Sequence, residues 1–262
     1  MGSSDQQDSS SSSEDTARSE KVRNMGVEGG LFRASMDKIK HSHSVGQSLR
    51  AAFVLSGVFS DKLLYSELLS QFAHVTCSFE ELLLKSEAFP KLKAMYLFGP
   101  LYTSDLEDLL GPSSQAASLV RAPSLEYAEL LRSHSKTEHS KESLLAAAVI
   151  LWGPLVIGGG AVMAPRVKKS YGSGCVAVFR SVTGPGRKDR QRAFIDFFDA
   201  AAEGLDFDKV VELCGTYMDF NNRIMGAVER RPKWFRYARA GAAAAVVAVV
   251  AVVVARAAAR RR

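Results

Sequence analysis

Histidine is the residue type in this sequence best suited to metal chemistry, and one histidine stands on an apolar helical face. Phe32, Met36, Ile39 and His43 are spaced four, three and four residues apart, so they share one side of a helix. On that side His43 can point into a helical bundle and bind a metal through its imidazole. A lone histidine on an apolar face is more often a satisfied core residue than a ligand. His41, on another face of the same helix, is the competing candidate.

A second candidate region is the uncharged stretch of twenty residues at 144–163, whose apolar run ends in Gly158, Gly159 and Gly160. Each glycine in a helix costs about 1 kcal/mol relative to alanine, so three in a row indicate that something flat or bulky approaches the backbone closely. The alternative is a core helix that kinks at Pro154 and packs closely on its neighbours. The length would also permit a membrane span, but the proline and the glycines argue against one.

The elements that must position these residues are helices. Apolar residues recur at intervals of three and four over 53–82, 125–131 and 194–201. Alternation typical of strands is nearly absent, and the short apolar run 175–179 is interpreted as a loop. The pattern predicts an all-α bundle, which we place at residues 31–229.

The N-terminal residues 1–30 form a separate segment. They contain a serine run at 9–13 and few large apolar side chains, so they cannot bury enough surface to offset the entropy of ordering. We predict a disordered tail. It has no apolar core of a signal peptide, and its acidic residues argue against a mitochondrial presequence.

Composition argues against two further classes of protein. Nine of the 34 basic residues lie in 230–262, leaving 25 basic against 28 acidic residues elsewhere, a net charge of −3. This weakens a nucleic-acid interpretation, which needs a basic face on the folded domain. Cys77, Cys175 and Cys214 are scattered and suggest neither a disulfide framework nor a zinc site.

The C-terminal residues 230–262 predict a membrane anchor. Residues 240–255 are only Ala, Gly and Val, and as a helix they span about 24 Å. Trp234, Phe235 and Tyr237 precede this run, where aromatic rings favour the membrane interface. The alternative, an alanine-rich soluble helix, would need a polar face that the valines do not leave. An anchor so placed leaves the folded domain in the cytosol.

The order and spacing of several motifs over roughly residues 31–229 resemble the heme oxygenase family. In that family two leucines and small apolar residues lead into Gly-Asp-Leu-Ser-Gly-Gly, which bends over one face of heme. Aligned from Leu144, this hexapeptide falls on 155–160, so Gly159 and Gly160 match. Leu155 stands for the first glycine and Val156 for the catalytic aspartate. Residues 60–81, 99–107 and 194–229 are similar to further segments of the family, with His74 in register as a structural residue.

The resemblance implies a heme site on the first helix. His43 takes the place of the proximal ligand, and Gln47 that of a glutamate four residues later. A glutamine can still accept from the imidazole N–H, but it gives the ligand less anionic character. The family's cationic partners of the heme propionates fall on Ile195 and Asp199, and an aspartate would repel a propionate. The candidates that remain are Lys38 and Lys40 on the first helix, together with Arg190 or Arg192.

The resemblance implies heme oxygenation to biliverdin, with heme bound and an NADPH-dependent reductase as partner. Val156, however, cannot hold water or relay protons, so heme turnover is expected to be weak or absent. The alternative is a catalytically inactive, membrane-tethered binding or scaffold protein. A third class, the tail-anchored apoptosis regulators, is similar only in Trp152-Gly153. Animal heme oxygenases are anchored to the endoplasmic reticulum, which we rank slightly above the mitochondrial outer membrane.

Overall fold

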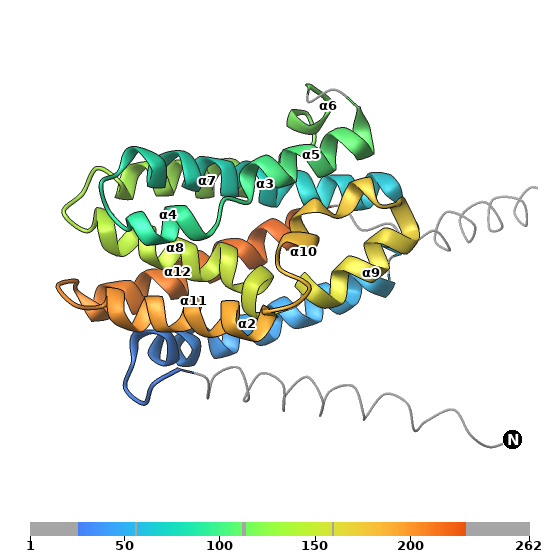
Figure 1. Cartoon of the computed structure of the whole chain (residues 1–262). Coiled ribbons are helices and arrows are strands. Elements are labelled where there is room, and N and C mark those ends of the chain that lie inside the picture. Colours follow the sequence, from blue (N-terminus) through green and yellow to red (C-terminus); the bar gives the residue numbers. More distant parts are fainter. Residues whose placement is uncertain (1–25, 56, 112–113, 159, 229–262) are drawn as a thin grey trace, which may run out of the picture.

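The computed structural model describes residues 26–55, 57–111, 114–158 and 160–228, and this part of the chain is helical with no strand. The expected all-α bundle is therefore confirmed, whereas the predicted anchor at 230–262 and most of the predicted disordered tail lie outside the described residues. Figure 1 shows long helices packed side by side. The helices are α2 (Leu31–Leu55), α3 (Lys62–Lys85), α4 (Pro90–Met95), α5 (Gly99–Leu110), α6 (Ser114–Ala117), α7 (Ala122–His134), α8 (Ser140–Gly153), the π-helix η1 (Pro154–Gly158), α9 (Gly160–Tyr171), the 3₁₀-helix η2 (Gly174–Val176), α10 (Ala177–Ser181), α11 (Arg187–Ala201) and α12 (Phe207–Ala227).

Helix α8 forms the centre of the bundle, because every residue from Glu142 to Gly153 is buried. The window Ser140–Gly158 is long and apolar enough to cross a membrane, yet 78% of it is buried inside the protein. In the described part of the chain this stretch is therefore a core helix, as Pro154 and the glycines predicted. This finding concerns the described residues alone, and the predicted anchor is not among them.

Helices α2 and α12 lie side by side and run in the same direction (Figure 1). Small or polar residues where the two helices touch determine which residues of α2 lie beside which residues of α12. A Cβ atom on Gly215 would lie 3.2 Å from the Lys38 side chain, and one on Gly46 would lie 2.8 Å from Asn222. Between these two points the Ser42 hydroxyl donates to Asp219 over 2.7 Å. The close approach of α2 therefore depends on glycine on both helices.

Four carboxylates occupy helix N-termini, where unpaired backbone N–H groups favour negative charge. Asp61 accepts from two backbone N–H groups of α3, and Asp206 from one of α12. Buried Asp105 accepts from the N–H groups of Ala177 and Val178 at α10. Asp199 accepts from Phe32 N over 2.9 Å and from Val27 N over 3.3 Å, which fixes the turn before α2. Residues 26–30 of the predicted disordered tail thus belong to the folded domain.

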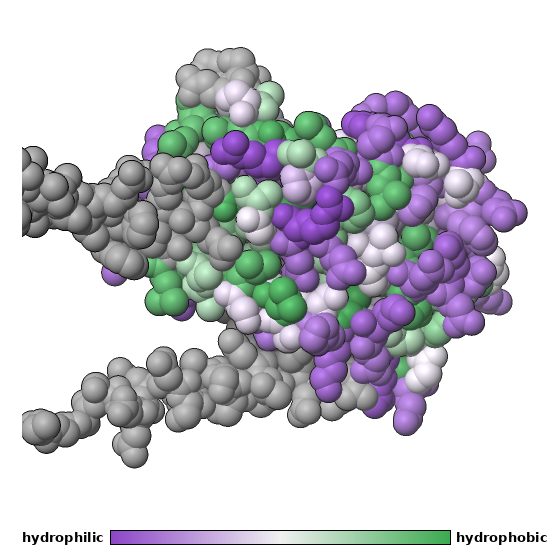
Figure 2. Space-filling model, turned by 180° about the vertical axis from the view of Figure 1, so that it is seen from behind, coloured by the Kyte–Doolittle hydropathy of each residue, from purple (hydrophilic) through white to green (hydrophobic). Residues whose placement is uncertain are grey.

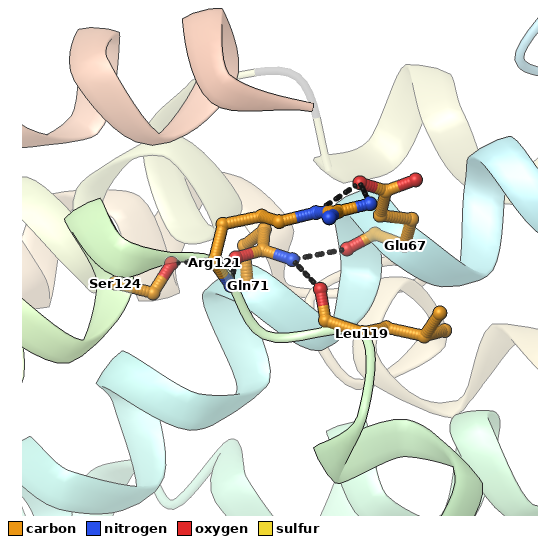
Figure 3. A network of polar contacts seen from close by, with 5 residues as sticks. All are labelled: Glu67, Gln71, Leu119, Arg121 and Ser124. Atoms are coloured by element: carbon orange, nitrogen blue, oxygen red, sulfur yellow. Dashed lines mark hydrogen bonds and ion pairs between the residues drawn. The ribbon is translucent and has the colours of Figure 1, made fainter. Parts of the chain in front are cut away.

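A polar network fastens the start of α7 to α3 (Figure 3). The Gln71 amide donates to the carbonyl of Leu119 over 2.6 Å and accepts from Arg121 N and the Ser124 hydroxyl, both over 2.8 Å. The Arg121 guanidinium also pairs with Glu67 at 2.7 Å. Gln71 and Ser124 are buried and their hydrogen-bonding groups are satisfied within the network, so it is a structural clamp.

Candidate functional site

The candidate site has two sides, and the first is the face of α2 that carries His43. Phe32 and Ile39 are buried and His43 is half-buried, as the predicted common face requires. Burial lowers the pKa of His43 to about 4, and the positive charge of Arg50 acts in the same direction. The imidazole is therefore neutral at pH 7, which is the form that binds a metal. His41, the competing candidate, is exposed.

The other predicted heme contacts on α2 are more open to solvent. Gln47 is half-buried, and it makes no hydrogen bond to His43 among the residues described. Lys38 and Lys40 are exposed, and the aliphatic stem of Lys38 lies against Gly215 of α12. Both lysines therefore keep a charged amine that is accessible from outside.

The second candidate side is the break between α8 and α9, which the sequence predicted as a kink at Pro154. The structure places a π-helix there, so that residues Pro154–Gly158 form one wide turn. A π-turn accommodates a proline because the missing N–H falls where the hydrogen-bond ladder is already disturbed. Such turns are frequent at functional sites.

The side chains that stand for the family's glycine and aspartate do not form a polar surface. Leu155 is 8% exposed and Val156 is 2% exposed, so both belong to the apolar core. Neither side chain offers a hydrogen-bond donor or acceptor at this position. No group of three or more His, Cys, Asp or Glu side chains that could hold a metal ion exists in the described part of the chain.

Gln191 of α11 is a site residue that the sequence did not reveal. Its buried side-chain amide donates to the carbonyl oxygens of Val156 and Ile157, over 3.2 and 3.0 Å. These bonds hold the wide turn to α11 and give its carbonyls partners in the core. A polar residue in the amphipathic segment 187–201 carries no signal of its own, since many such residues face solvent.

The three glycines differ in what surrounds them. A Cβ atom on Gly160 would lie 2.5 Å from the Leu155 carbonyl oxygen and 2.9 Å from Val182, so packing within the protein requires glycine there. A Cβ atom on Gly158 would meet no heavy atom within 4 Å, and this residue is partly exposed. Gly159 lies outside the described residues. Of the two described glycines, Gly158 is therefore the one with open space beside its Cα atom.

Helices α11 and α12 connect the two sides. Helix α12 packs against both α2 and α8, and α11 packs against both α2 and η1. The positions that stand for the family's propionate partners are used otherwise: Ile195 is fully buried, and Asp199 caps α2. The expectation that Asp199 would oppose a propionate therefore gives way to a structural role at a helix N-terminus.

Two other histidines are not at this site. His74 on α3 is half-buried, and its Nε2 atom has no hydrogen-bond partner in the described part. His134 on α7 is half-buried, and its Nδ1 atom lies 2.7 Å from the buried Tyr217 hydroxyl. Ser143 reaches the same hydroxyl over 2.7 Å, so this network joins α7, α8 and α12.

Behind η1 lies a cluster of aromatic rings around a buried carboxylate. Trp152 is fully buried, packs against Phe79 and Phe98, and donates its indole N–H to Glu80 over 3.2 Å. Glu80 also accepts from Phe98 N and Gly99 N at the start of α5. Burial raises the pKa of Glu80 and these hydrogen bonds oppose that rise. The cluster gives η1 a rigid support.

Comparison with known proteins defines the fold. No protein-family model matches the sequence, and no curated protein matches it. Solved heme oxygenases are similar in structure. Heme oxygenase 2 from Chlamydomonas reinhardtii, without heme, has a TM-score of 0.66 and 22% identity over 77% of this chain and 99% of that chain. Heme oxygenase-1 from Synechocystis, in complex with heme, has a TM-score of 0.61 and 17% identity over 76% and 92%. The enzyme from Leptospira interrogans has a TM-score of 0.60 and 16% identity over 75% and 98%. The chain has a heme oxygenase-like fold.

Proposed function

We propose that this protein binds heme through His43 and turns it over weakly or not at all, while a C-terminal anchor holds it on a membrane. The observation that carries the proposal is the neutral, half-buried imidazole on α2, combined with an apolar, buried Val156 on η1. Heme in such a fold needs one axial nitrogen ligand, and His43 fits that need. The cationic Lys38 and Lys40 are the residues that would meet its propionates.

The residues of this chain do not fit proton delivery on the η1 side. Val156 offers no donor or acceptor, and the carbonyls of Val156 and Ile157 are engaged by Gln191. We therefore assign ligand binding and positioning to this protein. A biliverdin-forming oxygenase supplied by an NADPH-dependent reductase is the second candidate, supported by the overall fold.

A hemin titration of the purified full chain in detergent tests the binding proposal. His43→Ala is expected to abolish the Soret band of the complex, because it removes the ligand atom. His41→Ala is the matched control, since the two residues are two positions apart and His41 is exposed. An unchanged Soret band in His43→Ala would contradict the assignment.

A turnover assay with NADPH and a reductase separates the two candidates. Wild-type protein is expected to form little or no biliverdin. The double substitution Leu155→Gly and Val156→Asp introduces the glycine and the aspartate of the heme oxygenase family. We expect it to raise the rate of biliverdin formation. Because Val156 is only 2% exposed, a carboxylate there also lowers stability, so thermal unfolding is measured in parallel. Wild-type turnover that the double substitution leaves unaffected would contradict the proposal.

The proposed anchor is tested by deletion. Removing residues 233–262 is expected to move the protein from the carbonate-resistant membrane fraction to the soluble fraction, with its helical circular dichroism retained. Membrane association of the shortened chain would show that the anchor is not there. Localisation of the full chain in cells distinguishes the endoplasmic reticulum, which we favour, from the mitochondrial outer membrane.

A further inference from the structure

One end of the bundle carries large apolar side chains that the fold leaves in solvent. Leu55 is 81% exposed at the end of α2, Val54 is 45% exposed beside it, and Leu63 is 56% exposed at the start of α3. A tight turn over 57–61 joins the two helices, so the three residues, here called the apolar tip, belong to one end of the molecule. This end lies at the right of Figure 1.

The chain leaves the described structure close to the apolar tip. Lys38 lies against Gly215, Ser42 bonds to Asp219, and Gly46 lies against Asn222, so parallel helices α2 and α12 keep a nearly constant register. The same register sets Val228, the last described residue of this segment, beside about residue 51 of α2. Val54 and Leu55 stand one turn further on. The described structure therefore ends next to the tip, and the basic and apolar segment 230–262 follows this end in the sequence.

Two positive side chains lie at the turn that joins α2 to α3. Lys62 is exposed next to Leu63, and the Arg166 guanidinium of α9 lies 5.9 Å from the centre of the Phe59 ring in the joining turn. Asp61, an acidic residue in that turn, is engaged in capping α3. Figure 2 shows green apolar side chains toward the left, where this end lies in that view, and mainly purple side chains at the opposite end.

We infer that the apolar tip rests on an anionic lipid surface, so that the membrane orients the domain as well as tethering it. The inference rests on the proposed anchor, since the chain that would enter the bilayer starts beside the tip. Leucine and valine side chains partition into the membrane interface, and neighbouring lysine and arginine attract anionic headgroups. A lipid surface is favoured over a second protein because the apolar tip lies beside the point where the chain continues into the proposed anchor, and because Lys62 and Arg166 near the tip are positively charged.

The docked orientation places the two ends of α3 at different distances from the membrane. Leu63 and Leu84 lie on one helix, 21 positions apart, which is about 31 Å along its axis. Their exposures, 56% and 54%, are nearly equal. They therefore form a matched pair in which residue type, helix and exposure are the same and only the end of the molecule differs.

The test uses the full chain in vesicles of phosphatidylcholine and phosphatidylserine that carry a quencher in the lipid. Cys77→Ser removes the exposed thiol, whereas Cys175 and Cys214 are buried. An environment-sensitive fluorophore is attached through Leu63→Cys or Leu84→Cys. The Leu63 label is expected to lose about half of its fluorescence, and the Leu84 label almost none, because only the former reaches the interface.

Three outcomes separate the two proposals. Flotation of the protein with the vesicles and quenching at Leu63 alone support both. Flotation with neither label quenched, or with both quenched equally, leaves the anchor in place and overturns the docked orientation. Failure to float overturns the proposed anchor and the docking inference with it.

A charge-reversed variant tests the electrostatic part separately. Lys62→Glu with Arg166→Glu is expected to reduce quenching of the Leu63 label without changing flotation, because the tail still inserts. Lys85→Glu, at the far end of α3, is the control and should leave the quenching unchanged. If the Leu63 label is quenched equally in the Lys62→Glu, Arg166→Glu double variant and in Lys85→Glu, the basic residues beside the tip do not contact lipid.

Discussion

Helix α2 and the π-helix η1 hold the two sides of the same candidate site, and they differ in what they present. On α2 a side chain with metal-binding chemistry is half-exposed and uncharged. On η1 the backbone makes an unusual bend, but its side chains are part of the core. The comparison teaches that the shape of a site and its chemistry are encoded separately, because a bend depends on packing and a proton relay on polar atoms.

The largest expected effect tests whether packing alone maintains the bend. Gly160→Ala is expected to lower the free energy of unfolding by about 3 kcal/mol, because the new Cβ atom would overlap the Leu155 carbonyl oxygen, which belongs to the backbone and cannot move aside. Gly158→Ala is the control and should be neutral or slightly stabilising in the same chemical denaturation experiment, since its Cβ meets nothing within 4 Å.

The same glycine pair sharpens the ligand hypothesis. If heme lies against η1 at Gly158, then Gly158→Ala weakens hemin binding although it does not weaken the fold. Gly158→Ala with unchanged hemin affinity would place the ligand elsewhere on the η1 side.

A smaller effect is expected from the residue that holds η1 to α11. Gln191→Leu preserves volume but removes two hydrogen bonds to buried carbonyl oxygens, so we expect a loss of about 2 kcal/mol in the free energy of unfolding. Lys188→Ala, an exposed position on the same helix, is the control and should change little. An unfolding free energy that stays the same in Gln191→Leu would show that the bend does not need this amide.

The smallest effect concerns pH on the α2 side. Since the pKa of His43 is lowered to about 4, the imidazole stays deprotonated, and hemin affinity should be nearly constant from pH 7 down to about pH 5. An unshifted histidine, with a pKa near 6.5, would instead lose affinity by about tenfold per unit below that value. Hemin titrations at several pH values, with the signal of His43→Ala subtracted, distinguish a ligand with a lowered pKa from one with an unshifted pKa. A midpoint near 6.5 would contradict His43 as the ligand.

The same pKa shift has a consequence for stability. The folded state disfavours protonation of His43, whereas the unfolded chain takes up a proton near pH 6.5. Its contribution therefore lowers stability as the pH falls from about 6.5 toward 4. Acid denaturation followed in wild type and His43→Phe is expected to show a weaker pH dependence in the variant.

Much of the architecture was predictable from the sequence because helical periodicity reports burial. The spacing of Phe32, Ile39 and His43 predicted the face of α2. For the twenty uncharged residues at 144–163, a core helix with a kink at Pro154 was one of two interpretations, beside a site where a ligand approaches the glycines. Periodicity could not report which groups each polar side chain contacts in the folded protein. Nothing in residues 187–201 distinguishes Gln191 from solvent-facing polar neighbours, because its role depends on where η1 packs. The segment 175–179, interpreted as a loop, contains the end of η2 and most of α10, since Asp105 supplies a cap from far along the chain.

Residue types alone determined that this chain forms a helical bundle, that the position of the family's aspartate holds an apolar side chain, and that a basic, apolar segment ends the sequence. These properties follow from which atoms are present, so they need no knowledge of contacts. Only the tertiary structure decided that Asp199 caps a helix, that Gly160 is required by packing and Gly158 is not, and that the pKa of His43 is lowered. Each of these depends on the surroundings that folding creates, because burial, hydrogen bonding and pKa are properties of those surroundings rather than of the residue itself.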